Sequence, residues 1–344
     1  MTRTRLLPPA GPVWVMGAGA IGCWVGGSLQ AAGAEVHFVG RPSVLDELRI
    51  AGLTLTDLDG RRTHIAPAEL RLHAELPEAG QGLASPPLTL LCVKSGATAE
   101  AAALLALRMP AGTPVLSLQN GLRNPAIAAT AAPALAVIPG MVGFNVVRAS
   151  PGHWHRGTWG ELAAQANPAL TPWLPAFEAA LLPLALHADL APVQWGKLLL
   201  NLNNPVNALS GLPLRQQLLD RDLRWVMAAL IDEALVALRA HGIEPAQLTT
   251  VPPRRLPTGL RLPTWLFRLI ARGSLRMDEQ ARTSMAEDLA RGRATEIDAL
   301  CGEVVRLAAA AGLKAPHNEW MVQRLGQAAP GRMSGREMRQ ALRI

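Results

Sequence analysis

The chain contains very little lysine. Of its 33 basic residues, only Lys94, Lys197 and Lys314 are lysines, and all the others are arginines. Burial can lower the pKa of a lysine ammonium toward neutrality, whereas an arginine stays charged. A lysine retained in so arginine-rich a sequence is therefore a candidate for a role that a guanidinium cannot fill.

Cysteine is equally scarce, which bears on both disulfides and metals. Cys23, Cys92 and Cys301 lie far apart in apolar segments, without a CxxC pair or metal-ligand spacing. They are interpreted as buried free thiols of a protein in a reducing compartment. His153 and His155 alternate along an expected strand without a third ligand nearby, so they are interpreted as strand-face residues and no metal site is predicted.

The excess of basic residues does not form a long run. The net charge of +7 and the pI of about 10.5 occur in proteins that bind nucleic acid or membrane surfaces. However, the arginines are scattered, and no run is longer than Arg61-Arg62 or Arg254-Arg255. Residues 6–34 carry no charge, but their glycines make a poor membrane span. The sequence predicts a soluble, cytoplasmic protein with neither nucleic acid nor membrane as a partner.

A glycine loop follows the first expected strand, residues 12–16, and opens a helix that runs to about residue 32. A second strand, 35–40, completes a strand–GxGxxG–helix–strand unit typical of dinucleotide-binding domains. The first glycine makes the turn, the second lets backbone amides approach a pyrophosphate, and the third lets the helix pack on the sheet. The predicted cofactor-binding loop consists of Gly17, Ala18, Gly19, Ala20, Ile21 and Gly22.

The residues after the second strand favour NADP(H) over NAD(H). An acidic residue at this point would bind the ribose hydroxyls of NAD, but the sequence has Gly40-Arg41-Pro42. Arg41 can pair with a 2′-phosphate. Lys94 and Asn120 follow two further expected strands, 88–93 and 113–118. Because ligands of parallel sheets bind at the carboxyl ends of the strands, both are site candidates.

Strands and helices alternate only in the first half of the chain. Residues 53–65 are expected to form a hairpin around an Asp59-Gly60 turn. Further strands are expected at 134–139, 141–148 and 153–160, where they could close the sheet antiparallel. Later segments are helical: 191–210, 220–241, 265–275, 278–291, 295–311 and 317–327. The sequence predicts an α/β fold, with a Rossmann-type NADP-binding domain at 1–189 and an all-helical substrate domain at 190–344.

The 191–210 helix carries a polar stripe in an apolar setting. On a helical wheel Lys197, Asn201 and Asn204 share one face. Unpaired polar groups inside a protein cost about 1–3 kcal/mol each, so the stripe requires partners from the protein or a ligand. Further along, Glu296 follows a candidate N-cap, Thr295, and could equally be a first-turn acid favoured by the helix dipole.

Six motifs together resemble the ketopantoate reductase (2-dehydropantoate 2-reductase) family. They are the glycine loop, Val93-Lys94, Gln119-Asn120-Gly121, Lys197 to Asn201, Ser284-Met285 and Thr295 to Asp298. The resemblance covers residues 12 to about 325. It implies NADPH-dependent reduction of 2-dehydropantoate to pantoate, as in pantothenate biosynthesis, in a cleft between a Rossmann domain and a helical domain.

The resemblance also assigns roles to residues. Lys197 is the expected catalytic acid, and Glu296 the carboxylate that places it and a further cofactor contact. Lys94 lies on the cofactor side, and Ser284 contacts the substrate carboxylate. The other substrate-binding residues implied are Asn120, which also contacts the cofactor, together with Asn201 and Asn204.

Some residues depart from the family pattern. Asn204-Pro205 lie one position closer to Lys197 than in the family, so Asn204 and Asn207 remain alternatives for one substrate contact. A Pro- and Arg-rich insertion occupies about 251–276. The alternatives are a reductase of another 2-oxo or 3-hydroxy acid, or a non-catalytic NADP-binding sensor. The oligomeric state stays open, with a homodimer among the possibilities.

Overall fold

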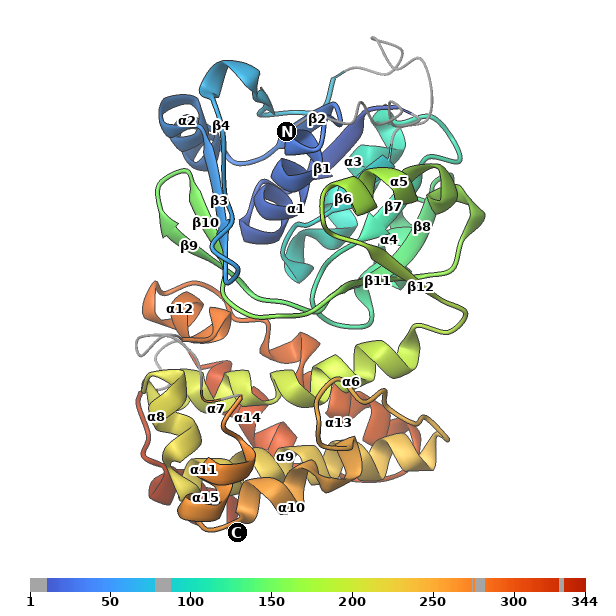
Figure 1. Cartoon of the computed structure of the whole chain (residues 1–344). Coiled ribbons are helices and arrows are strands. Elements are labelled where there is room, and N and C mark those ends of the chain that lie inside the picture. The colour runs from blue at the N-terminus through green and yellow to red at the C-terminus, as the bar shows by residue number, and fades with distance from the viewer. Residues whose placement is uncertain (1–10, 78–87, 274, 276–281, 328–330) are drawn as a thin grey trace. The chain divides into compact units, whose positions relative to one another are not determined.

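The computed structural model describes residues 11–77, 88–273, 275, 282–327 and 331–344. The chain divides into two compact units, Met1–Leu190 and Ala191–Ile344 (Figure 1). The first combines strands and helices, and the described residues of the second form helices joined by loops, without a strand. The expected fold class, a Rossmann-type α/β domain followed by an all-helical domain, is confirmed.

An eight-stranded sheet forms the framework of the first unit. Its strand order is β12-β11-β8-β7-β6-β1-β2-β5, and β5, β2, β1, β6, β7 and β8 run parallel. Only β11 is antiparallel to its neighbour β8. Buried apolar runs such as Val13–Met16 are typical of parallel strands covered on both faces. The strands are β1 Val13–Met16, β2 Val36–Val39, β5 Arg71–His73, β6 Leu88–Leu91, β7 Pro114–Ser117, β8 Ala136–Val142, β11 Leu162–Gln165 and β12 Leu184–His187.

Helices cover the two faces of this sheet. The helix α1 (Ala20–Ala31) buries its glycine-rich middle on one face, where it contributes Trp24, Val25 and Leu29 to the larger core. The helices α3 (Thr98–Arg108) and α4 (Asn124–Ala131) cover the other face, around Leu105 and Ala128. The remaining helices of this unit are α2 (Pro42–Ala51), α5 (Leu174–Ala179) and short 3₁₀ turns at Pro67–Glu69, Ser95–Ala97 and Pro168–Trp173.

A second, four-stranded sheet corrects one expectation. The expected hairpin is confirmed as β3 (Leu53–Asp57) antiparallel to β4 (Arg62–Ile65). Residues 146–156 do not close the main sheet: β9 (Val146–Ser150) and β10 (His153–Arg156) join this hairpin in the order β4-β3-β10-β9. The physical reason is packing, because this small sheet covers α1 on the side away from the main sheet (Figure 1). The His153 and His155 rings both contact the Thr56 hydroxyl at 2.9 Å.

The second unit is built around the 20-residue helix α9 (Arg221–Ala240), against which most of its other helices pack. Asp220 caps α9 through its carboxylate, which accepts from the amides of Asp222 and Leu223. The other helices are α6 Ala191–Asn201, α7 Asn203–Ser210, α8 Leu214–Leu219, α10 Leu256–Arg261, α11 Thr264–Ile270, α12 Ser284–Ala290, α13 Cys301–Ala310, α14 Pro316–Leu325 and α15 Gly335–Leu342, with 3₁₀ turns at Pro253–Arg255 and Ile297–Ala299. The start of the helix expected at 278–291 lies outside the described residues.

The expected single helix over residues 191–210 is wrong. The chain forms α6 and α7, separated at Leu202. Pro205 explains the break, because a proline lacks the amide hydrogen of a helical residue and its ring clashes with the carbonyl four residues earlier, here that of Asn201. The helix expected at 295–311 is likewise divided, into the 3₁₀ turn Ile297–Ala299 and α13. Within the described residues, no helix is long and apolar enough to cross a membrane.

Candidate functional site

The glycine loop joins the carboxyl end of β1 to the start of α1. Gly17 has a φ of +112°, and a Cβ there would lie 2.7 Å from the backbone of Cys92 and Val93 after β6. A Cβ on Gly22 would collide with the Gly17 carbonyl and lie 2.7 Å from Val15 Cγ1. Both positions therefore require glycine, the first for its conformation and contact with β6, the second for the packing of α1 on the sheet.

Gly19 differs from Gly17 and Gly22 because no protein atoms pack beside it. No heavy atom lies within 4 Å of the position that its Cβ would occupy. Gly19 is also the N-cap of the 12-residue α1, and no side chain caps the helix. The first amides of a helix require a partner, and together with the helix dipole they favour an anion. This open, uncapped turn fits the pyrophosphate of a dinucleotide.

The loop after β2 lies against the glycine loop. A Cβ on Gly40 would lie 2.6 Å from Ala18 Cβ, and the Gly40 amide donates to the His73 carbonyl at 3.2 Å. Arg41 follows as the N-cap of α2, with an exposed side chain. The structure therefore places Arg41 directly beyond the loop that contacts Ala18, at the carboxyl edge of the parallel strands.

Lys94 and Asn120 lie on two adjacent loops of the same edge, after β6 and β7. Lys94 is exposed and Asn120 is partly buried. The Ser95 hydroxyl donates to the Asn120 carbonyl at 3.3 Å, and Asn124 Nδ2 donates to the same carbonyl at 2.5 Å and to Ser95 Oγ at 3.0 Å. The two loops are thus joined through side chains that hold the Asn120 backbone.

A buried polar cluster beneath these loops was not predicted from the sequence. The side-chain amide of Gln119 donates through Nε2 to the Val93 carbonyl at 2.9 Å and to Thr98 Oγ1 at 2.7 Å. The Thr98 hydroxyl in turn donates to Asn124 Oδ1 at 3.0 Å. Gln119, Thr98 and Asn124 are all buried. The sequence placed Gln119 next to Asn120, an expected site residue. Its spacing did not identify Thr98 or Asn124 as the partners of Gln119.

In the second unit, Lys197 and Asn201 lie one turn apart on α6. Trp195, Gly196, Leu198 and Leu199 around them are buried, and Lys197 is itself partly buried. Burial lowers the pKa of Lys197 well below its ordinary value, to about 8, and the nearby Glu296 carboxylate opposes this by raising the pKa. Because the pKa stays above 7, the side chain is mostly an ammonium at neutral pH, yet it can release a proton.

Glu296 lies directly before the 3₁₀ turn Ile297–Ala299 and is partly buried. It occupies the N-cap position of that turn, but its side chain accepts no capping hydrogen bond. Its carboxylate is near enough to Lys197 to raise the pKa of the ammonium.

The polar stripe is interrupted after Asn201, so the wheel argument fails for Asn204. Asn204 belongs to α7, beyond the break at Leu202. Within the described parts of the chain, neither the Asn201 nor the Asn204 side chain has a hydrogen-bond partner, and both remain partly exposed. Their amides are therefore available to a ligand.

The Asn207 side chain, in contrast, forms its hydrogen bonds within the protein. It is fully buried, its Nδ2 donates to the Leu212 carbonyl at 2.9 Å, and its Oδ1 accepts from the Thr283 amide at 3.0 Å and hydroxyl at 3.1 Å. Thr283 is the N-cap of α12, whose first residue is the exposed Ser284. Asn207 thus fixes the start of the helix that presents Ser284, and Asn204 is the better candidate for the remaining contact.

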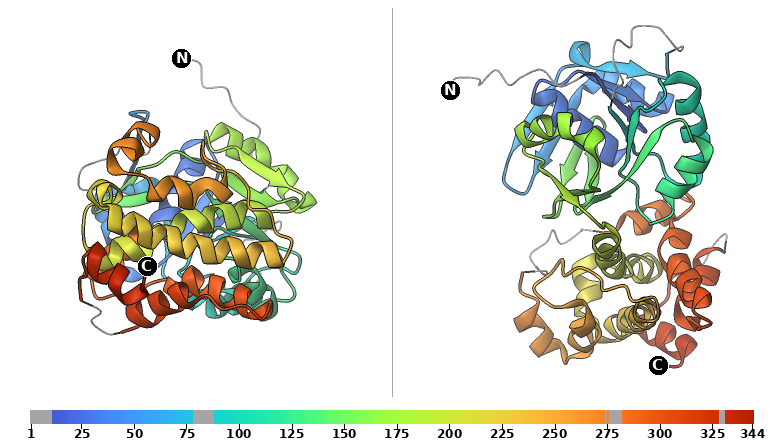
Figure 2. Two further views of the ribbon diagram at one scale, coloured as in Figure 1. Left: turned by 90° about the horizontal axis from the view of Figure 1, so that it is seen from below. Right: turned by 90° about the vertical axis from the view of Figure 1, so that its right-hand side faces the viewer.

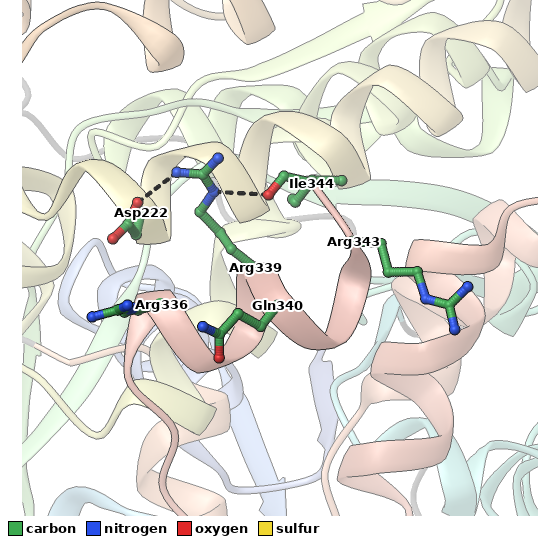
Figure 3. A pocket seen from close by; sticks show the side chains of 6 residues that line it. All are labelled: Asp222, Arg336, Arg339, Gln340, Arg343 and Ile344. Atoms are coloured by element: carbon green, nitrogen blue, oxygen red, sulfur yellow. Dashed lines mark hydrogen bonds and ion pairs between the residues drawn. The ribbon is translucent and has the colours of Figure 1, made fainter.

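A separate pocket of about 420 Å³ lies along α15 (Figure 3). Its Arg339 guanidinium donates to Asp222 at 2.7 Å and to the Ile344 carbonyl at 3.1 Å. Arg336 and Arg343 extend from opposite ends of the helix and point away from each other. The pocket therefore lacks convergent donors, and none of the predicted site residues lines it.

Taken by itself, the first unit has the features of a dinucleotide-binding oxidoreductase domain. A glycine loop opens an uncapped helix at the carboxyl edge of a parallel sheet, and the chain then supplies an arginine, a lysine and an asparagine along that edge.

The comparisons with known proteins define the family. The model described as "Ketopantoate reductase PanE/ApbA" matches residues 13–168, and its C-terminal counterpart matches residues 189–329. The chain therefore belongs to the ketopantoate reductase family, as the resemblance predicted. This family consists of NAD(P)-dependent oxidoreductases that act on keto acids.

Individual relatives agree with this assignment. The 2-dehydropantoate 2-reductase of Halobacterium salinarum is 28% identical over 303 residues, which cover 86% of this chain and 91% of that protein. The same enzyme of Pyrococcus abyssi is 26% identical over 325 residues, covering 89% and 94%. A PanE/ApbA family ketopantoate reductase structure from Ralstonia eutropha JMP134 matches with a TM-score of 0.76 at 29% identity, covering 92% of this chain and 98% of that chain.

The low pKa of Lys197 can be measured without any assay of activity. In protein labelled with ¹³C at lysine Cε, NMR should show a resonance that titrates near pH 8 and is lost in Lys197→Arg. Because the Glu296 carboxylate raises this pKa, Glu296→Gln should move the titration to lower pH. Asp298→Asn is the matched control, since the Asp298 carboxylate engages Arg306 at 2.8 Å. An unchanged midpoint in Glu296→Gln would show that Glu296 does not act on Lys197.

Proposed function

We propose that the protein is an NADPH-dependent reductase that converts 2-dehydropantoate to pantoate. The observation that supports this most is the Lys197 ammonium, whose pKa is lowered by burial to about 8 and which is accompanied by Glu296. Relatives with the printed name 2-dehydropantoate 2-reductase, matched over most of their length, favour the same substrate.

Lys197 is the proposed proton donor. When bound, the reduced nicotinamide supplies the hydride that reduces the C2 carbonyl of the keto acid. Negative charge then develops on the carbonyl oxygen, where the Lys197 ammonium stabilises it and transfers a proton to give the hydroxyl. Glu296 keeps Lys197 protonated at neutral pH and orients it. Asn120 donates a further hydrogen bond to the same oxygen.

Three side chains of the second unit are proposed to hold the substrate. The Asn201 and Asn204 amides, which have no partner among the described residues, bind the polar groups near the carbonyl. The exposed Ser284 hydroxyl, at the first residue of α12, binds the substrate carboxylate. One hydroxyl and two amides without a side-chain partner among the described residues suit a small molecule with several oxygens better than an apolar one.

The cofactor contacts are proposed for the first unit, with Glu296 as a further contact from the second. The backbone of Gly17 to Gly22 binds the pyrophosphate at the uncapped start of α1. Arg41 pairs with the 2′-phosphate of NADP(H), and Lys94 contributes positive charge on the cofactor side. Residues 1–189 then form the NADP-binding domain and residues 190–344 the substrate domain. The fold alone does not choose the cofactor, because a structure of D-mandelate dehydrogenase with NADH has the same fold at 16% identity and a TM-score of 0.73.

One alternative follows from the break in the polar stripe. Asn204-Pro205 lie one position closer to Lys197 than in the resembled pattern, and α7 starts after Leu202. This shift changes where the Asn204 amide lies along the substrate, and it favours a keto acid with another side chain as the second candidate.

A substrate panel tests the function directly. Purified protein should oxidise NADPH with branched 2-keto acids, fastest with 2-dehydropantoate under the main proposal and with another acid under the alternative. Cofactor binding without turnover of any 2-keto acid would contradict both and would indicate a sensor.

Loss of Lys197 should affect chemistry more than cofactor binding. Lys197→Ala removes the proton donor, so we expect kcat to fall by roughly 10²- to 10⁴-fold, with the Kd for NADPH nearly unchanged. Lys314→Ala, at an exposed lysine, is the control and should leave kcat unaltered. Near-normal turnover of Lys197→Ala would remove Lys197 from its proposed role.

Arg41 should discriminate between the cofactors. Arg41→Asp removes a charge-assisted contact to the 2′-phosphate and places a like charge there, so NADPH should bind at least about tenfold more weakly. NADH, which lacks that phosphate, should bind almost as before. Arg49→Asp, on the exposed face of the same helix α2, is the matched control. Equal losses of affinity for both cofactors would contradict the assignment of Arg41.

A further inference from the structure

The Pro- and Arg-rich insertion of the second unit has no part in the proposed reaction. Between Glu244 and Asp278 the sequence has no acidic residue and no lysine. It contains six arginines in this interval, Arg254, Arg255, Arg261, Arg268, Arg272 and Arg276. The described part of the interval folds into the 3₁₀ turn Pro253–Arg255, α10 and α11. The interval is therefore uniformly positive, whereas elsewhere in the sequence the arginines are scattered among acidic residues.

The helix α11 exposes large apolar side chains together with this charge. Trp265 is 67% exposed, Leu269 57% and Ile270 51%. Trp265, Arg268 and Leu269 follow each other at i, i+3 and i+4 on α11, so they lie along one helix face. Arg272 lies in the turn directly after the helix, and both arginines are exposed. Figures 1 and 2 place α11 at the outside of its unit. We call Trp265, Arg268, Leu269, Ile270 and Arg272 the α11 patch.

The opposite side of α11 is fixed to the protein by Arg224 of α9. Arg224 is 1% exposed, and its guanidinium lies 4.4 Å from the centre of the buried Phe267 ring. It donates to the carbonyls of Leu260 and Leu262 at 2.9 Å each and to Thr264 Oγ1 at 3.2 Å. These bonds fix the chain before α11 and the first turn of the helix. With Phe267 turned to Arg224, Trp265 and Leu269 lie on the exposed side of the helix.

We propose that the α11 patch binds the surface of anionic lipid membranes. Tryptophan and aliphatic side chains enter the boundary between headgroups and acyl chains, while arginines on the same face pair with anionic headgroups. Two acids of α9 are paired with other arginines, Asp232 with Arg261 at 2.6 Å and Asp222 with Arg339 at 2.7 Å. This is peripheral binding, which requires no spanning helix, and it revises the expectation that no membrane is a partner.

The combination of positive charge and apolar side chains favours an anionic lipid surface over a second copy of the chain or nucleic acid as the ligand of the α11 patch. A second copy of the chain docked on the same face would bring together two sets of arginines, Arg268 and Arg272, that have no ion pair among the described residues. Nucleic acid would use the arginines and Trp265 but leave Leu269 and Ile270 without a role, because phosphates and base edges need polar donors. An anionic lipid surface uses both the charges and the apolar side chains.

Co-sedimentation of the full chain with vesicles tests the proposal. The protein should sediment with vesicles that contain an anionic lipid such as phosphatidylglycerol at low ionic strength, and not with phosphatidylcholine alone. Arg268→Ser/Arg272→Ser should weaken partitioning by roughly 25-fold, about fivefold for each charge. Trp265→Ser/Leu269→Ser should weaken it by more than about tenfold. Because all four side chains are exposed, the variants should keep the wild-type Tm.

Two double variants match these changes elsewhere on the surface. Arg336→Ser/Arg343→Ser removes the same charge from two exposed positions, one in α15 and one directly after it. Ile50→Ser/Leu107→Ser removes apolar side chains that are 83% and 73% exposed. Both should bind vesicles like the wild type. Equal losses in the control variants, or no binding to anionic vesicles, would overturn the proposal. So would a dimer lost in Trp265→Ser/Leu269→Ser, or preferential capture of a single-stranded oligonucleotide by the patch.

Discussion

The balance of two opposing effects on the Lys197 ammonium is the constraint on which the proposed chemistry depends. The apolar surroundings of α6 lower its pKa, and the Glu296 carboxylate raises it, leaving a value of about 8. A lysine more deeply desolvated would lose its charge at neutral pH, and one in water would hold its proton too strongly to be an efficient acid. An arginine would not release a proton at all. This explains why a lysine persists at this position in a chain that uses arginine almost everywhere else.

The first unit depends on a different constraint, the close approach of backbone segments. Gly17 contacts the backbone after β6, Gly22 contacts the Gly17 carbonyl, and Gly40 contacts Ala18. The buried amides and hydroxyls of Gln119, Thr98 and Asn124 then connect the loops after β6 and β7. As a result, buried contacts hold the loops along one edge of the sheet, where the uncapped start of α1, Arg41, Lys94 and Asn120 lie. Such support is what the proposed binding of a cofactor requires.

Much of this could be predicted from the sequence, because local patterns determine it. The strand–glycine loop–helix unit, the Asp59-Gly60 hairpin and the change to helices near residue 190 all follow from short-range signals. The pairing of β10 with β3, which brings β9 into the second sheet, could not be predicted, since it depends on how α1 is covered. The helical wheel placed Asn204 on the same face as Lys197 because it assumed one unbroken helix. Pro205, which lacks an amide hydrogen, breaks that helix. Asn207, an amide like its neighbours in sequence, is distinguished only by the buried partners Thr283 and Leu212.

The pH dependence of the reductase reaction tests the central claim most directly. If Lys197 is the proton donor, only its ammonium form is active, and its folded-state pKa lies near 8. The kcat/KM for 2-dehydropantoate with saturating NADPH should then be constant near neutral pH and fall about tenfold per pH unit above about 8. The profile of Glu296→Gln should break at a lower pH. A rate that stays level to about pH 10, or a break unaffected by Glu296→Gln, would contradict the account.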